Sequence, residues 1–182
     1  MANVLVPLAQ GCEELEAVTV IDLLRRAGIE VTTAGLTEGP VTAKRGVVLH
    51  PDTTLDEALT KEYDMLVLPG GLPGATNLEQ DDRIRDLLIK LSNSDKFTAA
   101  ICAAPKVLAS AGLLEGKKAT CFPGILNQEQ IPGLDIEQPV VQDGKVVTSR
   151  GAGTAMDFAL TLIENLAGKS KRDEVEAGLA RP

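Results

Sequence analysis

The sequence predicts an α/β fold, a doubly wound sandwich in which helices cover both faces of a mostly parallel sheet. Strand-like and helix-like segments alternate along the chain, which is typical of this fold class. Aromatic residues make up only 2% of the chain and Trp is absent, so Val, Leu, Ile and Ala must build the core. That aliphatic composition favours a parallel sheet. The length of 182 residues suits one domain, residues 1–182.

The first half of the chain supplies three predicted strands. Residues 3–9, 30–36 and 63–71 are short apolar segments, and the last ends in two glycines. Residues 13–28 form a predicted helix between the first two strands, and residues 40–50 form a polar excursion or small hairpin. Four apolar residues recur at helical spacing along the helix: Leu15, Val18, Ile21 and Leu24.

The second half continues the alternation. Residues 81–94 form a predicted helix, residues 97–101 the central buried strand, and Pro105 begins the helix that follows it. Residues 140–150 read as a hairpin with Asp-Gly at its turn. Residues 154–168 form a long closing helix. In such a fold the functional site lies at the carboxyl ends of the strands, near a switch point in strand order.

Charge and hydropathy exclude several classes of partner. The formal net charge is −8, whereas a phosphate-binding surface must be basic, so we expect no stable nucleic-acid complex. No stretch of about 18 apolar residues is present, so we expect no membrane span. The N-terminal segment lacks a basic region and already reads as a strand, and we therefore expect a cytoplasmic location.

Cysteine and histidine usage argues against structural metals and disulfides. The three cysteines, Cys12, Cys102 and Cys121, are widely spaced and form no CxxC pair, and the chain has one histidine. An odd number of scattered cysteines is not a disulfide framework, and a zinc site needs more ligands than these. We expect no metal and no cofactor.

Cys102 stands at the joint between a predicted strand and a predicted helix. This is the arrangement of a nucleophile elbow, in which a sharp turn exposes a side chain. Free N–H groups at the start of the helix favour the thiolate and lower the pKa of the thiol. A cysteine buried in a central strand is the alternative, since free cysteine is among the most buried residue types. The local pattern leaves both interpretations open.

Backbone donors are expected beside the thiol. Gly70 and Gly71 end a neighbouring strand, and glycine permits conformations that expose the N–H group. The N–H groups of Gly71 and Ala103 could form an anion pocket next to Cys102. A plain turn is the simpler interpretation, and a Gly-Gly pair alone is weak evidence for a site.

A carboxylic acid is the expected partner of the thiol. Glu13, Glu14 and Glu16 crowd the first turn of the first helix, where carboxylates stabilise the helix end. Glu16 lies between Leu15 and Ala17 and could point inward. Burial beside a thiolate would raise its pKa, so that it could stay protonated and donate a hydrogen bond to sulfur.

Four motifs together resemble the ThiJ/PfpI superfamily: "GCEELEAV", "VLPGG", "AAICAAP" and "TSRGAGTAMDFAL". More narrowly, the chain is similar to the parkinsonism-associated deglycase group and its bacterial YajL-like relatives, from about residue 3 to 168. The resemblance implies a flavodoxin-like three-layer sandwich, a homodimer and a reactive cysteine at the elbow. It assigns Cys102 and Glu16 as the catalytic pair, with Gly71 and Ala103 as oxyanion-binding donors.

The chain departs from many relatives near the cysteine. They place a histidine soon after the following strand, and Phe122 occupies that position here. The single histidine, His50, falls in the 40–50 excursion and is expected at the surface or the dimer interface. Ala103 also stands where amidotransferases and peptidases of the superfamily have a histidine. Cysteine acyl transfer needs such a base, so we expect neither activity.

Two functions follow from the resemblance. In the first, the protein is a deglycase or cofactor-free glyoxalase that acts on glyoxal or methylglyoxal adducts, with small aldehydes or glycated proteins and nucleotides as substrates. In the second, it is a redox sensor or chaperone whose Cys102 oxidises to sulfinate without efficient turnover. Both belong to protection against oxidative stress. For Cys12 and Cys121, packing in the core or at its rim is favoured over redox partnership.

Overall fold

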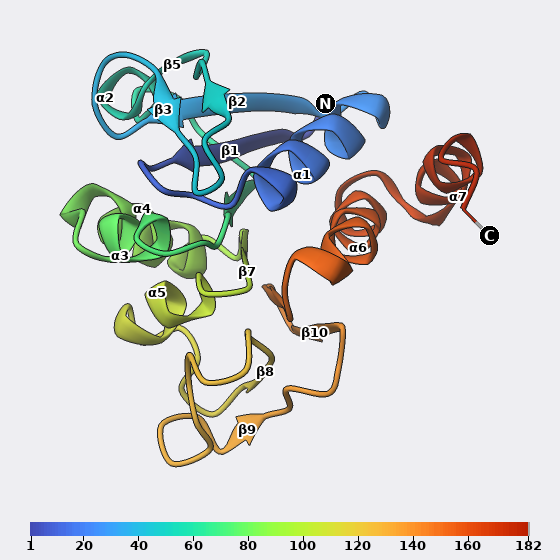
Figure 1. Cartoon of the computed structure of the whole chain (residues 1–182). Helices are drawn as coiled ribbons and strands as arrows, with labels where there is room; N and C mark the ends of the chain where they lie inside the picture. The colour runs from blue at the N-terminus through green and yellow to red at the C-terminus, as the bar shows by residue number, and fades with distance from the viewer. Residues whose placement is uncertain (182) are drawn as a thin grey trace.

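The structure, a computed structural model, describes residues 1–181, and its centre is a seven-stranded sheet (Figure 1). Neighbouring strands run parallel, except that β10 and β11 are antiparallel at one edge. The strands, in sheet order, are β10 (Val140–Asp143), β11 (Val146–Ser149), β7 (Phe97–Ile101), β6 (Met65–Leu68), β1 (Asn3–Leu8), β2 (Glu30–Gly35) and β5 (Thr53–Thr54). The predicted α/β fold class is confirmed.

Helices cover both faces of the sheet (Figure 1). One face carries α1 (Glu14–Arg26) and α6 (Ala155–Ala167), and α7 (Lys169–Gly178) packs against α6. The other face carries α2 (Leu55–Ala58), α3 (Gly74–Glu79), α4 (Asp82–Asn93) and α5 (Pro105–Ser110). A short 3-10 helix, η1 (Ala152–Thr154), leads into α6.

Each central strand divides its side chains between two apolar layers. In β1, Val4 and Val6 pack in the layer that contains α1 and α6, whereas Leu5 packs in the layer on the opposite face. Successive side chains of a strand point to opposite faces, so both faces demand apolar residues. That requirement explains why the central strands are continuous apolar segments in the sequence.

Both predicted hairpins are present. The 40–50 excursion contains the small antiparallel pair β3 (Val41–Thr42) and β4 (Val48–Leu49). The 140–150 segment forms β10 and β11, with Gly144 in a left-handed conformation at the turn. A further pair, β8 (Lys118–Ala119) and β9 (Gly133–Leu134), joins two segments that the sequence analysis left without structure.

The first helix has the predicted extent, but its orientation is set by other residues than its apolar repeat. Leu15 and Val18 are 51% and 47% exposed, respectively. Leu24 of the repeat is buried as predicted, but Ala17 and Val20, which lie outside the repeat, also face the sheet, and Glu16 is buried with them. The start of α1 therefore turns a carboxyl group inward and presents two apolar side chains outward.

Candidate functional site

The site is built where the connections from β1 and β6 leave in opposite directions. The chain passes from β1 through α1 to β2 on one side, and from β6 through α4 to β7 on the other. Because β1 and β6 are neighbours, their carboxyl ends mark a switch point in strand order, the usual place for a ligand crevice in open α/β sheets. The loops after β1 and β6 and the residue after β7 converge there.

Cys102 lies directly after β7 on a sharp turn. Its φ of 63° is in the left-handed region, which a residue with a side chain adopts at a cost on the order of 1 kcal/mol. Its N–H donates to the carbonyl of Ser149 at 2.9 Å, and its carbonyl accepts from the N–H of Phe122 at 2.8 Å. The surrounding backbone therefore holds the strained turn in place. The residue is partly exposed, as an elbow requires and a core cysteine does not.

Glu16 reaches the same place from the first turn of α1. The residue is completely buried, and its Oε2 accepts a hydrogen bond from the N–H of Gly70 at 2.8 Å. Its other oxygen, Oε1, has no oxygen or nitrogen partner among the described residues. Burial raises the pKa of this carboxyl to about 7, against the opposing effects of Cys102 and Gly70 as hydrogen-bond partners. Glu16 is thus a candidate proton carrier near neutral pH.

Gly70 shows how closely the thiol and the carboxyl approach. A Cβ placed on Gly70 would lie 2.7 Å from the Cβ of Cys102 and 2.7 Å from Oε2 of Glu16. No side chain fits between them, so this position requires glycine for space. Sequence reasoning placed the donor at Gly71 and gave Gly70 no role. The Gly-Gly pair was the signal that could have found it.

Two backbone N–H groups face the sulfur. Those of Gly71 and Ala103 act as hydrogen-bond donors that lower the pKa of Cys102. Gly71 has a φ of 84°, and a Cβ there would lie 2.5 Å from the backbone nitrogen of Glu13. The structure therefore places Cys102, Glu16, Gly71 and Ala103 close together.

The thiol and the carboxyl titrate as a coupled pair. Burial, followed by the negative charge of ionised Glu16, raises the pKa of Cys102 to about 12. This corrects the sequence-based expectation of a lowered pKa: α5 is a single six-residue helix, and burial beside a carboxylate outweighs its dipole. A protonated Glu16 removes the repulsion and can donate to sulfur. Above neutral pH the pair has therefore lost one proton and carries one negative charge. The remaining proton lies on one of the two groups and is donated to the other, which holds the charge.

The other cysteines and the histidine lie outside this constellation. Cys12 and Cys121 are completely buried, and burial raises the pKa of both, that of Cys12 to about 11. Such thiols behave as small apolar side chains. His50 is exposed beside the β3–β4 hairpin and lines a shallow hollow with Val18 and other residues of α1. None of the three joins the Cys102 crevice.

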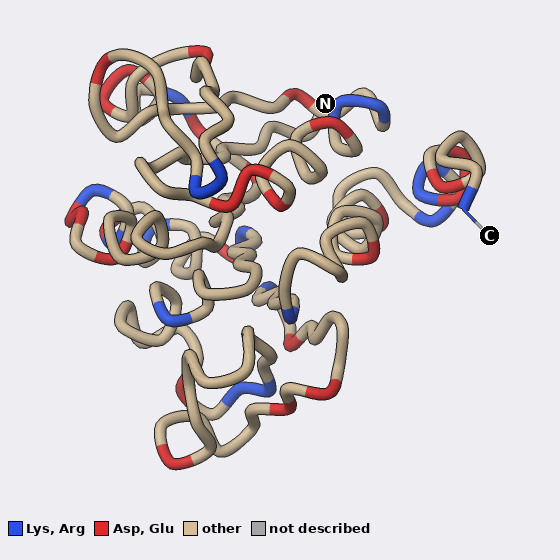
Figure 2. The backbone as a smooth tube through the Cα atoms, viewed as in Figure 1, with Lys and Arg blue, Asp and Glu red and all other residues tan. Residues whose placement is uncertain are grey.

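A basic hairpin tip lies beside the acidic start of α1 (Figure 2). The N–H of Arg45 donates to Glu14 at 2.8 Å, and the N–H of Lys44 donates to the carbonyl of Cys12 at the same distance. The charge of Lys44 also opposes the rise in the pKa of Glu16. Within residues 1–181, no cluster of three or more His, Cys, Asp or Glu side chains could hold a metal ion, and no helix could cross a membrane.

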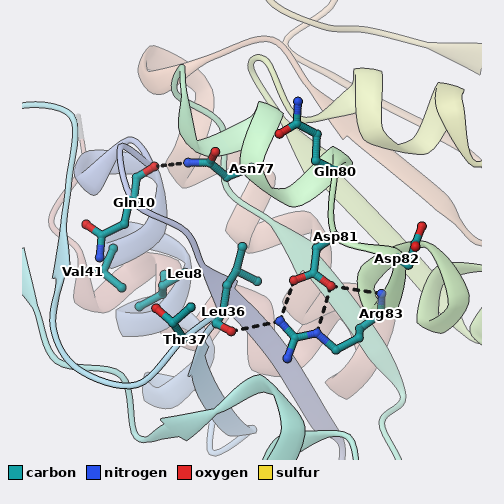
Figure 3. A pocket seen from close by; sticks show the side chains of 10 residues that line it. All are labelled: Leu8, Gln10, Leu36, Thr37, Val41, Asn77, Gln80, Asp81, Asp82 and Arg83. Carbon is teal, nitrogen blue, oxygen red and sulfur yellow. Dashed lines mark hydrogen bonds and ion pairs between the residues drawn. The ribbon is translucent and has the colours of Figure 1, made fainter.

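One hollow of the surface is lined by none of the four residues around the thiol. It has a volume of about 650 Å³ and is lined from the ends of β1 and β2 and the α3–α4 junction (Figure 3). The guanidinium of Arg83, which lines this hollow, donates hydrogen bonds to Asp81, to Asp56 and to the carbonyl of Leu36. These bonds use most of the donors of Arg83, so the hollow offers no free cation. The chemistry of the site is therefore that of the Cys102 crevice.

Comparisons with known proteins give the relatives of the chain. The model of the DJ-1/PfpI family matches residues 2–165. Protein dj-1beta of Drosophila melanogaster is 44% identical over 180 residues, covering 97% of this chain and 96% of the relative. The glutathione-independent glyoxalase DJR-1.2 of Caenorhabditis elegans is 33% identical over 175 residues, covering 96% and 92%.

Solved structures give the same result. The crystal structure of Drosophila melanogaster DJ-1beta superposes with a TM-score of 0.94 at 43% identity, covering 100% of this chain and 98% of that one. Oxidized DJ-1 of Toxoplasma gondii superposes with a TM-score of 0.91 at 37% identity, covering 98% of both chains. Both the sequence and the fold are therefore similar to those of these proteins along nearly the whole chain.

Proposed function

The chain belongs to the DJ-1/PfpI family, and from this premise we propose that it is a cysteine-dependent enzyme of carbonyl stress, a cofactor-free glyoxalase or deglycase. One observation carries the proposal: the carboxyl of Glu16 is completely buried beside Cys102, and its Oε1 has no hydrogen-bond partner among the described residues. A buried, unpartnered carboxyl oxygen costs stability. Its retention beside a thiol on a strained turn is the arrangement that proton transfer requires.

The reaction needs no external oxidant or reductant. The Cys102 thiolate attacks the aldehyde carbon of methylglyoxal and forms a hemithioacetal, whose oxygen accepts hydrogen bonds from Gly71 and Ala103. Glu16 removes the proton from that carbon and returns it to the neighbouring one, while the hydroxyl proton of the hemithioacetal passes to the former ketone oxygen. The aldehyde carbon is thereby oxidised to a thioester and the ketone carbon reduced to an alcohol. Water then hydrolyses the resulting thioester, which releases lactate and regenerates the thiol.

A deglycase differs only in what the aldehyde carries. When methylglyoxal is already joined to an amine or a thiol, as in a glycated protein or nucleotide, Cys102 displaces that group from the same carbon. The bond to the amine or thiol breaks, protonated Glu16 gives the leaving group its proton, and the remaining steps release the hydroxy acid. Neither reaction uses a histidine, in agreement with Phe122 and Ala103 at the positions where other superfamily members have one. A peptidase or amidotransferase would need that base.

Turnover of methylglyoxal tests the proposal. Protein purified free of contaminating glyoxalases should form lactate, and Cys102→Ser should abolish the reaction. Lactate formation that survives in Cys102→Ser, or no formation by the wild type, would exclude the enzyme. Cys121→Ser is the matched control, because that thiol is buried outside the crevice.

A second function, a redox sensor or chaperone, rests on the same pocket. The N–H groups of Gly71 and Ala103 and a protonated Glu16 are donors that could hold the oxygens of a Cys102 sulfinate. Intact mass after mild peroxide should then show a gain of two oxygens that is absent in Cys102→Ser. Oxidation spread evenly over Cys12, Cys102 and Cys121 would contradict this function.

The expected partner is a second copy of the chain. Leu15 and Val18 of α1 and Val47 and Val48 of the β3–β4 hairpin are each about half exposed. The bond from Arg45 to Glu14 joins the two elements, and we propose that the four side chains belong to one surface, which we call the α1–hairpin face. Exposed apolar surface of this kind marks interfaces, and a two-fold dimer would pair the face with itself.

A further inference from the structure

We propose that Phe122, together with Leu72, forms an apolar entrance to Cys102 and makes the site select carbonyl compounds that carry an apolar, planar substituent. The proposal rests on the proposed function for the identity of the reaction. It adds the part of the substrate that the site prefers, and it assigns that preference to residues outside the catalytic pair.

Phe122 is attached directly to the backbone of the elbow. Its N–H donates to the carbonyl of Cys102 at 2.8 Å, and its side chain is 50% exposed. The other two phenylalanines, Phe97 and Phe158, are partly and completely buried, respectively. Phe122 therefore exposes a flat apolar surface on a residue whose backbone is hydrogen-bonded to that of the partly exposed Cys102.

Gly151 keeps the ring in that position. Its φ is 170°, an extended conformation that any residue adopts, so the backbone does not require glycine there. A Cβ on Gly151 would, however, lie 3.3 Å from Cδ2 and 3.9 Å from Cε2 of Phe122. The missing side chain leaves space for the ring. The carbonyl of Ser149, two residues before Gly151, accepts from the N–H of Cys102. The segment that contacts the ring is therefore itself hydrogen-bonded to the elbow.

Leu72 adds a second apolar side chain from another loop. It follows Gly71, whose N–H faces the sulfur, and it is 42% exposed. The loop of Gly71, which donates to the sulfur, and the loop of Phe122, which donates to the Cys102 carbonyl, thus each expose an apolar side chain. Neither side chain can carry a proton, so they act on binding of the substrate and not on proton transfer. An apolar substituent gains from covering this surface, and an aromatic one also gains from stacking on the ring.

Paired substrates test the preference. The ratio of kcat/KM for phenylglyoxal to that for glyoxal should fall about fivefold in Phe122→Ala, the size typical of one aromatic contact. The change should appear in KM for phenylglyoxal. Gly151→Ala should move the ratio in the same direction, because the added Cβ displaces the ring. Ile89→Ala is the control, since Ile89 is 40% exposed on α4. An unchanged ratio in folded Phe122→Ala would overturn the proposal.

Alkylation of Cys102 separates this inference from the proposed function. The rates of modification by N-phenylmaleimide and N-ethylmaleimide, followed by peptide mass mapping, need no turnover. Their ratio should fall about fivefold in Phe122→Ala and stay constant in Ile89→Ala. If the ratio falls in Phe122→Ala but the protein has no glyoxalase activity, the proposed enzyme is excluded and the apolar entrance is supported. A constant ratio in both variants would overturn the entrance, whether or not the protein is an enzyme.

Discussion

At Cys102 and Glu16, two ionisable groups share one buried space, so the proton of one affects the other. The pKa of Glu16 is raised to about 7 mainly by burial, and that of Cys102 to about 12 by burial and then by the charge of Glu16. The first proton of the pair therefore leaves near neutral pH, and the second leaves only in strong base. Gly71 and Ala103 donate to the sulfur, and Gly70 donates to the carboxyl. The sulfur and the carboxyl are therefore both stabilised as the holder of the single negative charge.

The raised pKa of Glu16 predicts how stability depends on pH. The folded protein holds this proton up to about pH 7, whereas an unfolded glutamate loses it near pH 4.5. The folded state therefore binds more protons in this window, and the stabilisation is complete below about pH 4.5 and lost as the pH rises through about 7. Relative to Glu16→Gln, the wild type should lose on the order of 3 kcal/mol of unfolding free energy across it.

Urea denaturation of both proteins at pH 5 and pH 8 measures this difference. Glu16→Gln is nearly isosteric, so its own stability should change with pH only through the remaining groups. Glu57→Gln is a control at an exposed glutamate. If wild type and Glu16→Gln change in parallel with pH, Glu16 is not protonated in the folded state at neutral pH.

Gly70 supplies a second test at the scale of a single residue. Gly70→Ala places a methyl group 2.7 Å from the Cβ of Cys102, from Oε2 of Glu16 and from the carbonyl of Ile101. Such overpacking should destabilise the protein by about 1–3 kcal/mol and separate the catalytic pair, so that turnover falls at least 100-fold. Thermal melting and methylglyoxal turnover measure the two effects. Gly178→Ala, at the open end of α7, should leave both nearly unchanged.

Among the elements, α1 shows what its pattern predicts and what it leaves open. The 3.6-residue apolar repeat located the helix, but it contains Leu15 and Val18, which face outward. The inward position of Glu16 depends on a hydrogen bond to Gly70, 54 residues away, and the local sequence does not encode that contact. The neighbours Leu15 and Ala17 showed only that Glu16 could point inward, and the resemblance to a family supplied its pairing with Cys102.

The elements that sequence analysis missed are short or polar. Strands β8 and β9 have two residues each and pair across an intervening loop, so no periodic pattern marks them. Helix α7 follows the predicted closing helix, and Val175 is the only buried residue of α7. A helix with so little buried surface has a weak apolar repeat. In contrast, β1, β6 and β7 were predictable because burial on both faces demands a continuous apolar segment.

The α1–hairpin face predicts the effect of a charge on assembly. Val18→Lys places a charge in the middle of this face, where a second copy would bury it without a partner, so the dimer should dissociate at least 100-fold more readily. Sedimentation equilibrium measures the association constant. Ile89→Lys, at a similarly exposed position on α4, is the matched control and should not change assembly. A monomeric wild type, or a Val18→Lys variant that remains fully dimeric, would show that another surface is used.

Across the whole molecule, one sheet joins two separate apolar layers. Each layer contains side chains of β1, β6 and β7, so loss of packing on one face removes support from strands that the other face also uses. The prediction that residues 1–182 form one domain therefore has a thermodynamic consequence. Unfolding should be one cooperative transition, although the helices of the two faces lie on opposite sides of the sheet (Figure 1).

Truncation on each face tests this coupling. Leu88 of α4 and Leu162 of α6 are both completely buried, on opposite faces of the sheet. Leu88→Ala and Leu162→Ala should each lower the unfolding free energy by about 2–5 kcal/mol. Tyr63, the only tyrosine in a chain without Trp, packs in the layer of Leu88 and serves as a local reporter. At one fixed protein concentration, Leu162→Ala should lower the midpoints of the near-UV transition of Tyr63 and of the far-UV transition by the same amount. The two faces share their strands, so the loss of packing on one face destabilises both. A Tyr63 transition left at its wild-type midpoint while the far-UV signal splits in two would mean that the faces unfold as separate units.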